Sequence, residues 1–162
     1  MSGFWNRIFG KKPENREPEY DDLTGGTPSA PDKKVLAKVQ AQMASRNINE
    51  CLALGSMSIS SLLFILSTSN SKEELVNVST TLSNLLVATV DRTLPEILRI
   101  LKSALAAGDN TRLASAIATI NFACQHQFAN HMKPRMKEIL MREIRTSNGE
   151  YNSVLNTLLE SV

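Results

Sequence analysis

An uncharged stretch of apolar and small residues dominates the hydrophobic pattern of this chain. No charged residue occurs between Glu50 and Lys72, and residues 51–66 within this stretch read CLALGSMSISSLLFIL. A membrane span would need about 20 consecutive, mostly apolar residues, whereas this run has 16 and contains several serines. The pattern therefore predicts a central helix surrounded by protein, with a re-entrant membrane segment as the alternative.

Amphipathic helices are predicted on both sides of this segment, because apolar residues recur every three or four positions after polar capping residues. Asp32 is a suitable N-cap for a helix that begins at Lys33 and is interrupted at residues 46–47. Ser71 with Glu74 forms a capping-box pattern before the helix that follows the central one. These signals place a helix on either side of the uncharged segment.

Proline and glycine mark the later helix boundaries. Pro95 is expected in the first turn of a helix that starts again at Thr93, after the preceding helix ends near residues 91–92. Gly108 and the residue after it should close that helix and cap the next one. Pro134 is expected to break or bend the helix that begins near residue 111, since proline removes a backbone hydrogen bond and crowds the preceding turn.

Composition agrees with a helical domain. The length of 162 residues suits one domain, and with only 5 % aromatic residues the core must be built from Leu, Ile, Val, Ala and Met. No long segment alternates between apolar and polar residues as a strand would. We therefore predict an all-α fold, a single compact bundle of about six helices over residues 33–162, preceded by a disordered N-terminal arm of residues 1–32.

Charge and cysteine content narrow the cellular setting. The net charge of +2 is too small to indicate nucleic-acid binding by itself. Cys51 and Cys124 both lie within apolar helical pattern, so two buried thiols in a reducing compartment are expected rather than a disulfide. Residues 1–12 lack the continuous apolar region of a signal peptide. The expected location is cytoplasmic, peripheral on the inner face of a membrane.

The first twelve residues form an interfacial-anchor pattern. Four apolar side chains would gather on one side of a short helix, where aromatic rings favour the lipid headgroup region and basic residues favour an anionic leaflet. The alternative is that these side chains pack on the folded domain or remain loose. The candidates for membrane contact are Phe4, Trp5, Ile8, Phe9, Lys11 and Lys12, with Arg7 as a further basic residue.

Residues 13–34 have the composition of a flexible linker, with four prolines and two glycines. Within this linker, Pro28, Ser29, Ala30 and Pro31 form a P-[S/T]-A-P tetrapeptide. A proline-bearing segment is already biased to the extended conformation that aromatic-lined grooves bind. Tyr20 and Leu23 fit a Y-x-x-L pattern, for which an incidental tyrosine in a spacer is the alternative.

The order FWNRIFGKK, PEY and PSAPDK within the first 34 residues resembles the N-terminal arm of rhabdovirus-type matrix proteins. This resemblance implies late-domain motifs that recruit the ESCRT budding machinery, with an ESCRT-type UEV domain as the partner of the tetrapeptide. The family's P-P-x-Y motif is not intact, because Glu17 stands where its first proline would be. The family's matrix domains are mixed α/β, so the resemblance concerns the motif and not the fold.

Few residues suggest chemistry. Cys124, His126 and His131 could suggest a metal site. On a continuous helix, however, positions 124 and 126 face nearly opposite sides, and 124 and 131 lie about 10 Å apart along the axis. No glycine-rich phosphate loop or nucleophile elbow occurs. We therefore expect no catalytic residue, metal or cofactor, and predict that the protein is not an enzyme.

Basic residues gather near the C-terminal end of the chain. Between residues 133 and 145, five basic and two acidic side chains give a local charge of +3. These side chains form either a solvated outer face or, together with the basic N-terminus, a surface for anionic lipid or RNA. The candidates are Lys133, Arg135, Lys137, Arg142 and Arg145.

These observations predict a matrix-like structural protein. The helical domain would self-associate as a homo-oligomer or contact a nucleocapsid, the N-terminus would contact an anionic membrane, and the tetrapeptide would recruit a budding factor; a viral protein of this kind would enter the virion. One alternative is a regulatory adaptor that binds a polymerase or host factor, similar in layout to paramyxovirus C-type accessory proteins. Another is a bacterial or phage interaction domain with an accidental PSAP string.

Overall fold

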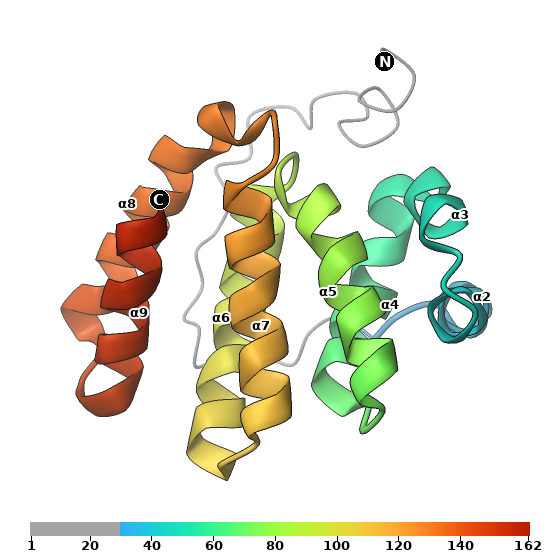
Figure 1. The fold of residues 1–162 in the computed structure, drawn as a ribbon, viewed down its shortest axis with the longest axis horizontal. Helices are drawn as coiled ribbons and strands as arrows, with labels where there is room; N and C mark the ends of the chain where they lie inside the picture. The colour runs from blue at the N-terminus through green and yellow to red at the C-terminus, as the bar shows by residue number, and fades with distance from the viewer. Residues whose placement is uncertain (1–29) are drawn as a thin grey trace.

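The computed structural model describes residues 30–162 of the chain, and this part is all-α, as predicted (Figure 1). The predicted anchor, the Y-x-x-L pattern and the first half of the tetrapeptide lie outside the described residues: Phe4, Trp5, Ile8, Phe9, Lys11, Lys12, Tyr20, Leu23, Pro28 and Ser29. The helices are α2 (Lys33–Ala44), α3 (Ile48–Ala53), the 3-10 helix η1 (Gly55–Ser58), α4 (Ile59–Thr68), α5 (Lys72–Leu86), α6 (Val90–Ala107), α7 (Asn110–Cys124), α8 (Ala129–Thr146) and α9 (Gly149–Ser161).

Helices α5, α6 and α7 form the middle of the bundle, with α2 to α4 on one side and α8 and α9 on the other (Figure 1). Helix α7 packs against both α5 and α6, and α9 packs against α8 and α7. One continuous core of Leu, Ile, Val, Ala and Met side chains connects these layers. Such a core removes one apolar stripe of every helix from water, which is the main stabilising term of a helical bundle.

The uncharged segment is not the single central helix that its composition predicts. Gly55, with φ of +60°, is the first residue of η1, and η1 separates α3 from α4. Most apolar residues of α4 are buried, although its Phe64 is 38 % exposed, and Met57 of η1 is 66 % exposed. Helix α4 nevertheless lies inside the body, where it packs against α2, α5, α6 and α7, and α5 packs against α2, α3, α4, α6 and α7.

Two of the three predicted boundaries at prolines and glycines differ from the structure. Helix α6 begins at Val90 rather than Thr93, so Pro95 is its sixth residue and lies beyond the first turn. Helix α8 continues through Pro134, also its sixth residue, and the break lies earlier, at residues 125–128. There the backbone N–H of Phe128 donates to Nδ1 of His126 at 3.2 Å, a side-chain bond that competes with helical pairing. The third boundary, at Gly108 in the left-handed conformation, is as predicted.

The predicted N-caps are confirmed. Asp32 accepts hydrogen bonds from the backbone N–H groups of Lys34 and Val35 at the start of α2. Ser71 accepts from the N–H of Glu74 at 3.3 Å, but its own N–H donates to Ser69 Oγ, so only half of the capping box forms. Both caps act over two or three residues, which is why the local sequence predicts them.

Candidate interaction surfaces

The PSAP tetrapeptide ends where the helical body begins. Ala30 is exposed and Pro31 is half-buried, and neither belongs to a regular element. Asp32 follows directly and caps α2 through its hydrogen bonds to Lys34 and Val35, at 2.9 and 3.1 Å. The last two residues of the motif therefore adjoin a fixed helix start.

The basic residues of α8 do not form one uniform patch. Lys137, Arg142 and Arg145 are exposed and line a surface hollow of about 380 Å³, together with one exposed carboxylate, that of Glu138. Met141, which is 41 % exposed, also lines this hollow. A hollow with cationic side chains around an apolar one is suited to an anionic partner that also offers apolar contact.

The other two basic residues of α8 have different surroundings. Arg135 is half-buried, and its guanidinium forms ion pairs with Asp91 and, at 2.8 Å, with Glu138. Lys133 is also half-buried, and its charge lowers the pKa of the Cys124 thiol, although burial has the larger effect and raises that pKa. Of the five predicted residues, three thus share the hollow and two flank it.

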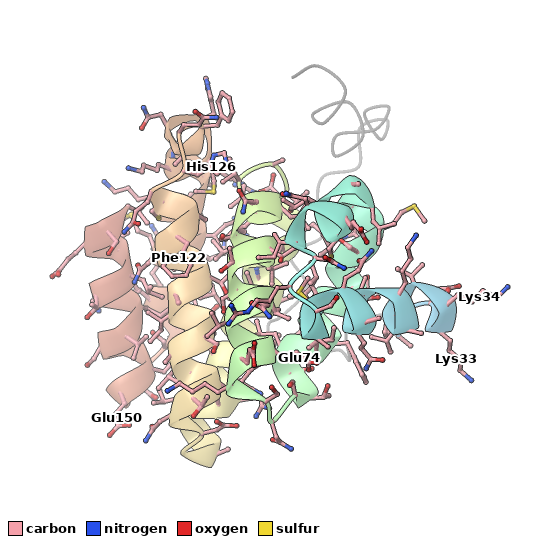
Figure 2. The ribbon with its side chains drawn as sticks, turned by 45° about the vertical axis from the view of Figure 1, so that its right-hand side comes forward. Lys33, Lys34, Glu74, Phe122, His126 and Glu150 are labelled. Carbon is pink, nitrogen blue, oxygen red and sulfur yellow. The ribbon has the colours of Figure 1, made fainter. Side chains whose placement is uncertain are left out.

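A second group of lysines lies far from α8. Lys33 and Lys34, at the start of α2, are exposed, as is Lys38 one turn further on. Helix α2 and the pair α8–α9 occupy opposite ends of the long axis (Figure 1), and Figure 2 shows Lys33 and Lys34 at one side and Glu150 of α9 at the other. The point at which the arm joins the body is therefore remote from the α8 hollow.

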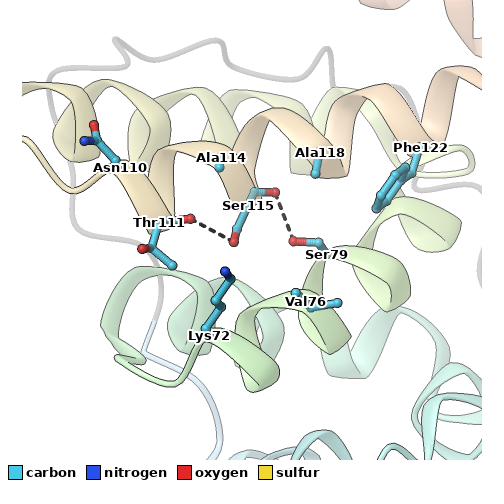
Figure 3. A pocket seen from close by; sticks show the side chains of 9 residues that line it. All are labelled: Lys72, Val76, Ser79, Asn110, Thr111, Ala114, Ser115, Ala118 and Phe122. Atoms are coloured by element: carbon cyan, nitrogen blue, oxygen red, sulfur yellow. Dashed lines mark hydrogen bonds between the residues drawn. The ribbon is translucent and has the colours of Figure 1, made fainter.

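An apolar groove of about 400 Å³ lies between α5 and α7 (Figure 3). Val76 of α5 is 52 % exposed and Phe122 of α7 is 45 % exposed at its edges. Between the two helices, Ser79 Oγ donates to the carbonyl of Ser115 at 2.9 Å, and within α7 Ser115 Oγ donates to the carbonyl of Thr111 at 3.0 Å. These hydroxyl groups are satisfied within the protein, so the groove offers mainly apolar contact.

The sequence prediction did not identify this groove. Neither Val76 nor Phe122 belongs to the apolar stripe that faces the core on its helix. A large apolar side chain outside the stripe is the signal that identifies such an exposed site. In the sequence, this signal identifies an exposed residue on a single helix. Only the packing of α5 against α7 brings Val76 and Phe122 to the same groove.

The cysteine and histidine residues do not converge. Cys124 is buried at the end of α7, His126 lies in the following turn and His131 is exposed on α8. The continuous helix on which we compared their directions is interrupted between them. Within residues 30–162, no three His, Cys, Asp or Glu side chains are placed to hold a metal ion.

The buried titratable groups are held in their neutral forms. Burial raises the pKa of Cys51 to about 11, although its hydrogen bond with Ser58 acts in the opposite direction. Burial also raises the pKa of Tyr151, and the adjacent Glu143 carboxylate raises it further. A thiol that stays protonated at neutral pH is a packing group rather than a nucleophile.

Comparison with known proteins identified no relative of this chain. No family model matches the chain, and no curated protein or solved structure matches it significantly. Among the helices of residues 30–162, none combines the length and apolar character needed to cross a bilayer.

Proposed function

We propose that the chain is a non-enzymatic, matrix-like structural protein that binds the inner face of an anionic membrane and recruits a budding factor. The observation that carries this proposal is the position of the PSAP tetrapeptide, whose last residue directly precedes the cap of the first helix of the body. A linear motif next to a folded domain couples whatever that domain binds to the partner of the motif.

The α8 hollow supports a membrane contact by the body. Each basic residue near an anionic leaflet contributes roughly 1 kcal/mol, so Lys137, Arg142 and Arg145 attract such a surface, and the Glu138 carboxylate in the same hollow offsets part of this attraction. One such signal gives only reversible binding, and stable association takes two. The aromatic and basic residues of the first twelve positions are the second signal in this proposal.

Matrix-like work also requires contact between copies of the chain or with a nucleocapsid. Val76 and Phe122 in the α5/α7 groove are apolar side chains that such a contact would remove from water. This groove is equally the observation that favours the alternative function, an adaptor that binds one soluble partner. Ordered multimers on lipid support the matrix-like function, and a discrete complex in solution supports the adaptor.

Recruitment is tested by binding of the full chain to an isolated ESCRT-type UEV domain, measured by calorimetry. We expect saturable binding that Pro28→Ala weakens by at least about tenfold, because the proline fills a preformed groove. Pro18→Ala, in the same arm but outside the tetrapeptide, is the matched control and should leave the affinity unchanged.

A peptide of residues 24–34 separates the motif from its context. If neither the peptide nor the chain binds, recruitment through PSAP is wrong. If the peptide binds and the chain does not, the body blocks the motif and the proposed role is equally wrong.

A further inference from the structure

A cleft of about 570 Å³ lies at the end of the bundle where η1, the α5–α6 connection and the first turns of α8 meet. Apolar side chains on this cleft include Val87, Val90 and Met132, of which Val87 and Met132 are buried. The volume lies in the range of small-molecule sites, which are mostly apolar with a few placed polar groups. The cleft therefore has room for a ligand with an apolar part.

Charged side chains of the cleft are predominantly basic. Arg92 of α6 and His131 of α8 are both exposed and line it from different helices. Arg135 and Asp91 also line it, and they form an ion pair with each other, so their charges offset locally. The guanidinium of Arg92 and the imidazole of His131 are thus the groups that a ligand in the cleft would meet.

The start of α6 adds to this positive character. Val90, Asp91 and Arg92 are its first three residues, and they line the cleft. Thr89, the N-cap residue, donates its hydroxyl to the carbonyl of Leu85 at 2.7 Å and makes no side-chain bond to the first-turn N–H groups. The partial positive charge of a helix start therefore adds to the charge of Arg92.

We propose that this cleft binds a phosphate-bearing anion, with the phosphate near Arg92 and His131 and its apolar attachment against Val87, Val90 and Met132. Guanidinium forks bind phosphate oxygens in bidentate geometry, and an imidazole supplies a further donor. The phosphate belongs either to a lipid headgroup or to a free organic phosphate. The lipid source rests on the proposed membrane function, whereas the anion site does not.

The position of the cleft relative to the α8 hollow favours a lipid. His131, Arg135, Arg142 and Arg145 follow one another on one side of α8 at spacings of four, seven and three residues. At 1.5 Å per residue, this row extends about 21 Å from the cleft. A membrane surface that lies along the row would place headgroups at the mouth of the cleft.

The test uses the full-length ¹⁵N-labelled chain, with amide chemical shifts recorded during titration with inorganic phosphate and with soluble short-chain phosphatidic acid. Chloride at matched ionic strength is the reference. We expect saturable shifts at residues 56, 89 and 92, and tighter binding of the phosphatidic acid because its acyl chains reach the apolar side chains. Equal affinity for the two probes would assign the site to free phosphate.

Arg92→Gln should weaken the binding of both probes by about tenfold, since a charged hydrogen-bond donor is lost. Lys38→Gln, which removes an exposed cation on α2 far from the cleft, is the matched control, with an expected change of less than about twofold. The proposal is overturned if the shifts are absent, if chloride reproduces them, or if the two variants bind alike. If the shifts occur but the native chain does not float with anionic vesicles, the membrane function is wrong and the anion site stands.

Discussion

A buried amide joins the end of one helix to the side of another. Asn77 of α5 is only 6 % exposed, and its Nδ2 donates to the carbonyl of Met43 at 2.7 Å. Met43 lies in the last turn of α2, where carbonyl groups lack helical donors. Asn77 thus supplies a donor that α2 cannot provide for itself, over a separation of 34 residues.

Replacing Asn77 by Ala should lower the free energy of unfolding by about 1–3 kcal/mol, because a buried carbonyl loses its partner. Urea denaturation of the variant measures this change. Asn156→Ala is the control, since Asn156 is exposed and bonds only within α9; it should change the stability by less than about 0.5 kcal/mol. Equal effects of the two substitutions would contradict the capping role of Asn77.

The buried thiol of Cys51 predicts a loss of stability at alkaline pH. Its pKa rises from 9.0 to about 11 on folding, chiefly through burial, so the folded state retains the proton over this range. Its contribution is fully present below pH 9 and is lost as the pH rises to 11. The loss is about 2–3 kcal/mol. Between pH 8 and pH 11, the free energy of unfolding should therefore decrease less with pH for Cys51→Ala than for the native chain, as measured by urea denaturation at each pH. The same decrease in both proteins would contradict this account.

The predictability of individual residues depends on the range of their contacts. Asp32 and Ser71 were predictable as N-caps because their partners lie two or three residues away. The role of Asn77 was not predictable. Neither was that of Arg112 in α7, whose Nε donates to the carbonyl of Leu66 in α4, 46 residues earlier in the chain. Such long-range bonds arise only from the packing of helices that the sequence does not place relative to each other.

At the scale of elements, the periodic pattern predicted which segments are helical, but it did not predict where the helices are interrupted. Ile120, Cys124, Phe128 and Met132 recur every four residues, so the apolar pattern continues across the interruption at residues 125–128. Phe128 and Met132 contribute to the core on the far side of the turn as they would on one helix. Within the interruption, the backbone N–H of Phe128 bonds to the side chain of His126, and this contact leaves no periodic signal in the sequence.

Helix α8 tolerates Pro134 rather than ending at it, and this predicts a stabilising substitution. Proline inside a helix costs roughly 3 kcal/mol relative to alanine, partly offset because proline also restricts the unfolded chain. Because Pro134 is exposed, its ring loses little packing on replacement. Pro134→Ala should therefore raise the free energy of unfolding by about 1–2 kcal/mol in urea denaturation. A decrease would show that the proline ring fixes a bend that α8 needs.

At the scale of the whole molecule, the basic surfaces lie at separate places. Helix α2, which carries the exposed lysines, lies at one end of the bundle, and α8, whose residues line the hollow, lies at the other (Figure 1). The sequence predicted the basic residues of α8 from their local charge, but the partial burial of Arg135 and Lys133 and the ion pair of Arg135 with Asp91 follow from helix packing. The α5/α7 groove was not predicted because it combines residues of two helices.

In the proposed function, the body and the N-terminal residues contribute separately to membrane binding. Substitution of Phe4 and Trp5 by Ala tests the N-terminal contribution, and substitution of Lys137 and Arg145 by Glu tests the α8 hollow. Lys38→Glu is the matched control, because Lys38 is also an exposed helical lysine but lies on α2. Salt should weaken the α8 contribution, since exposed charges are screened.

Flotation of the full-length chain with anionic vesicles, compared among these variants, tests the matrix-like account most directly. We expect the native chain and Lys38→Glu to float alike, each double variant to lose about tenfold or more in partitioning, and the combined variant to stay with the soluble fraction. Flotation that is unchanged by all of these substitutions, or a native chain that does not float, would contradict it.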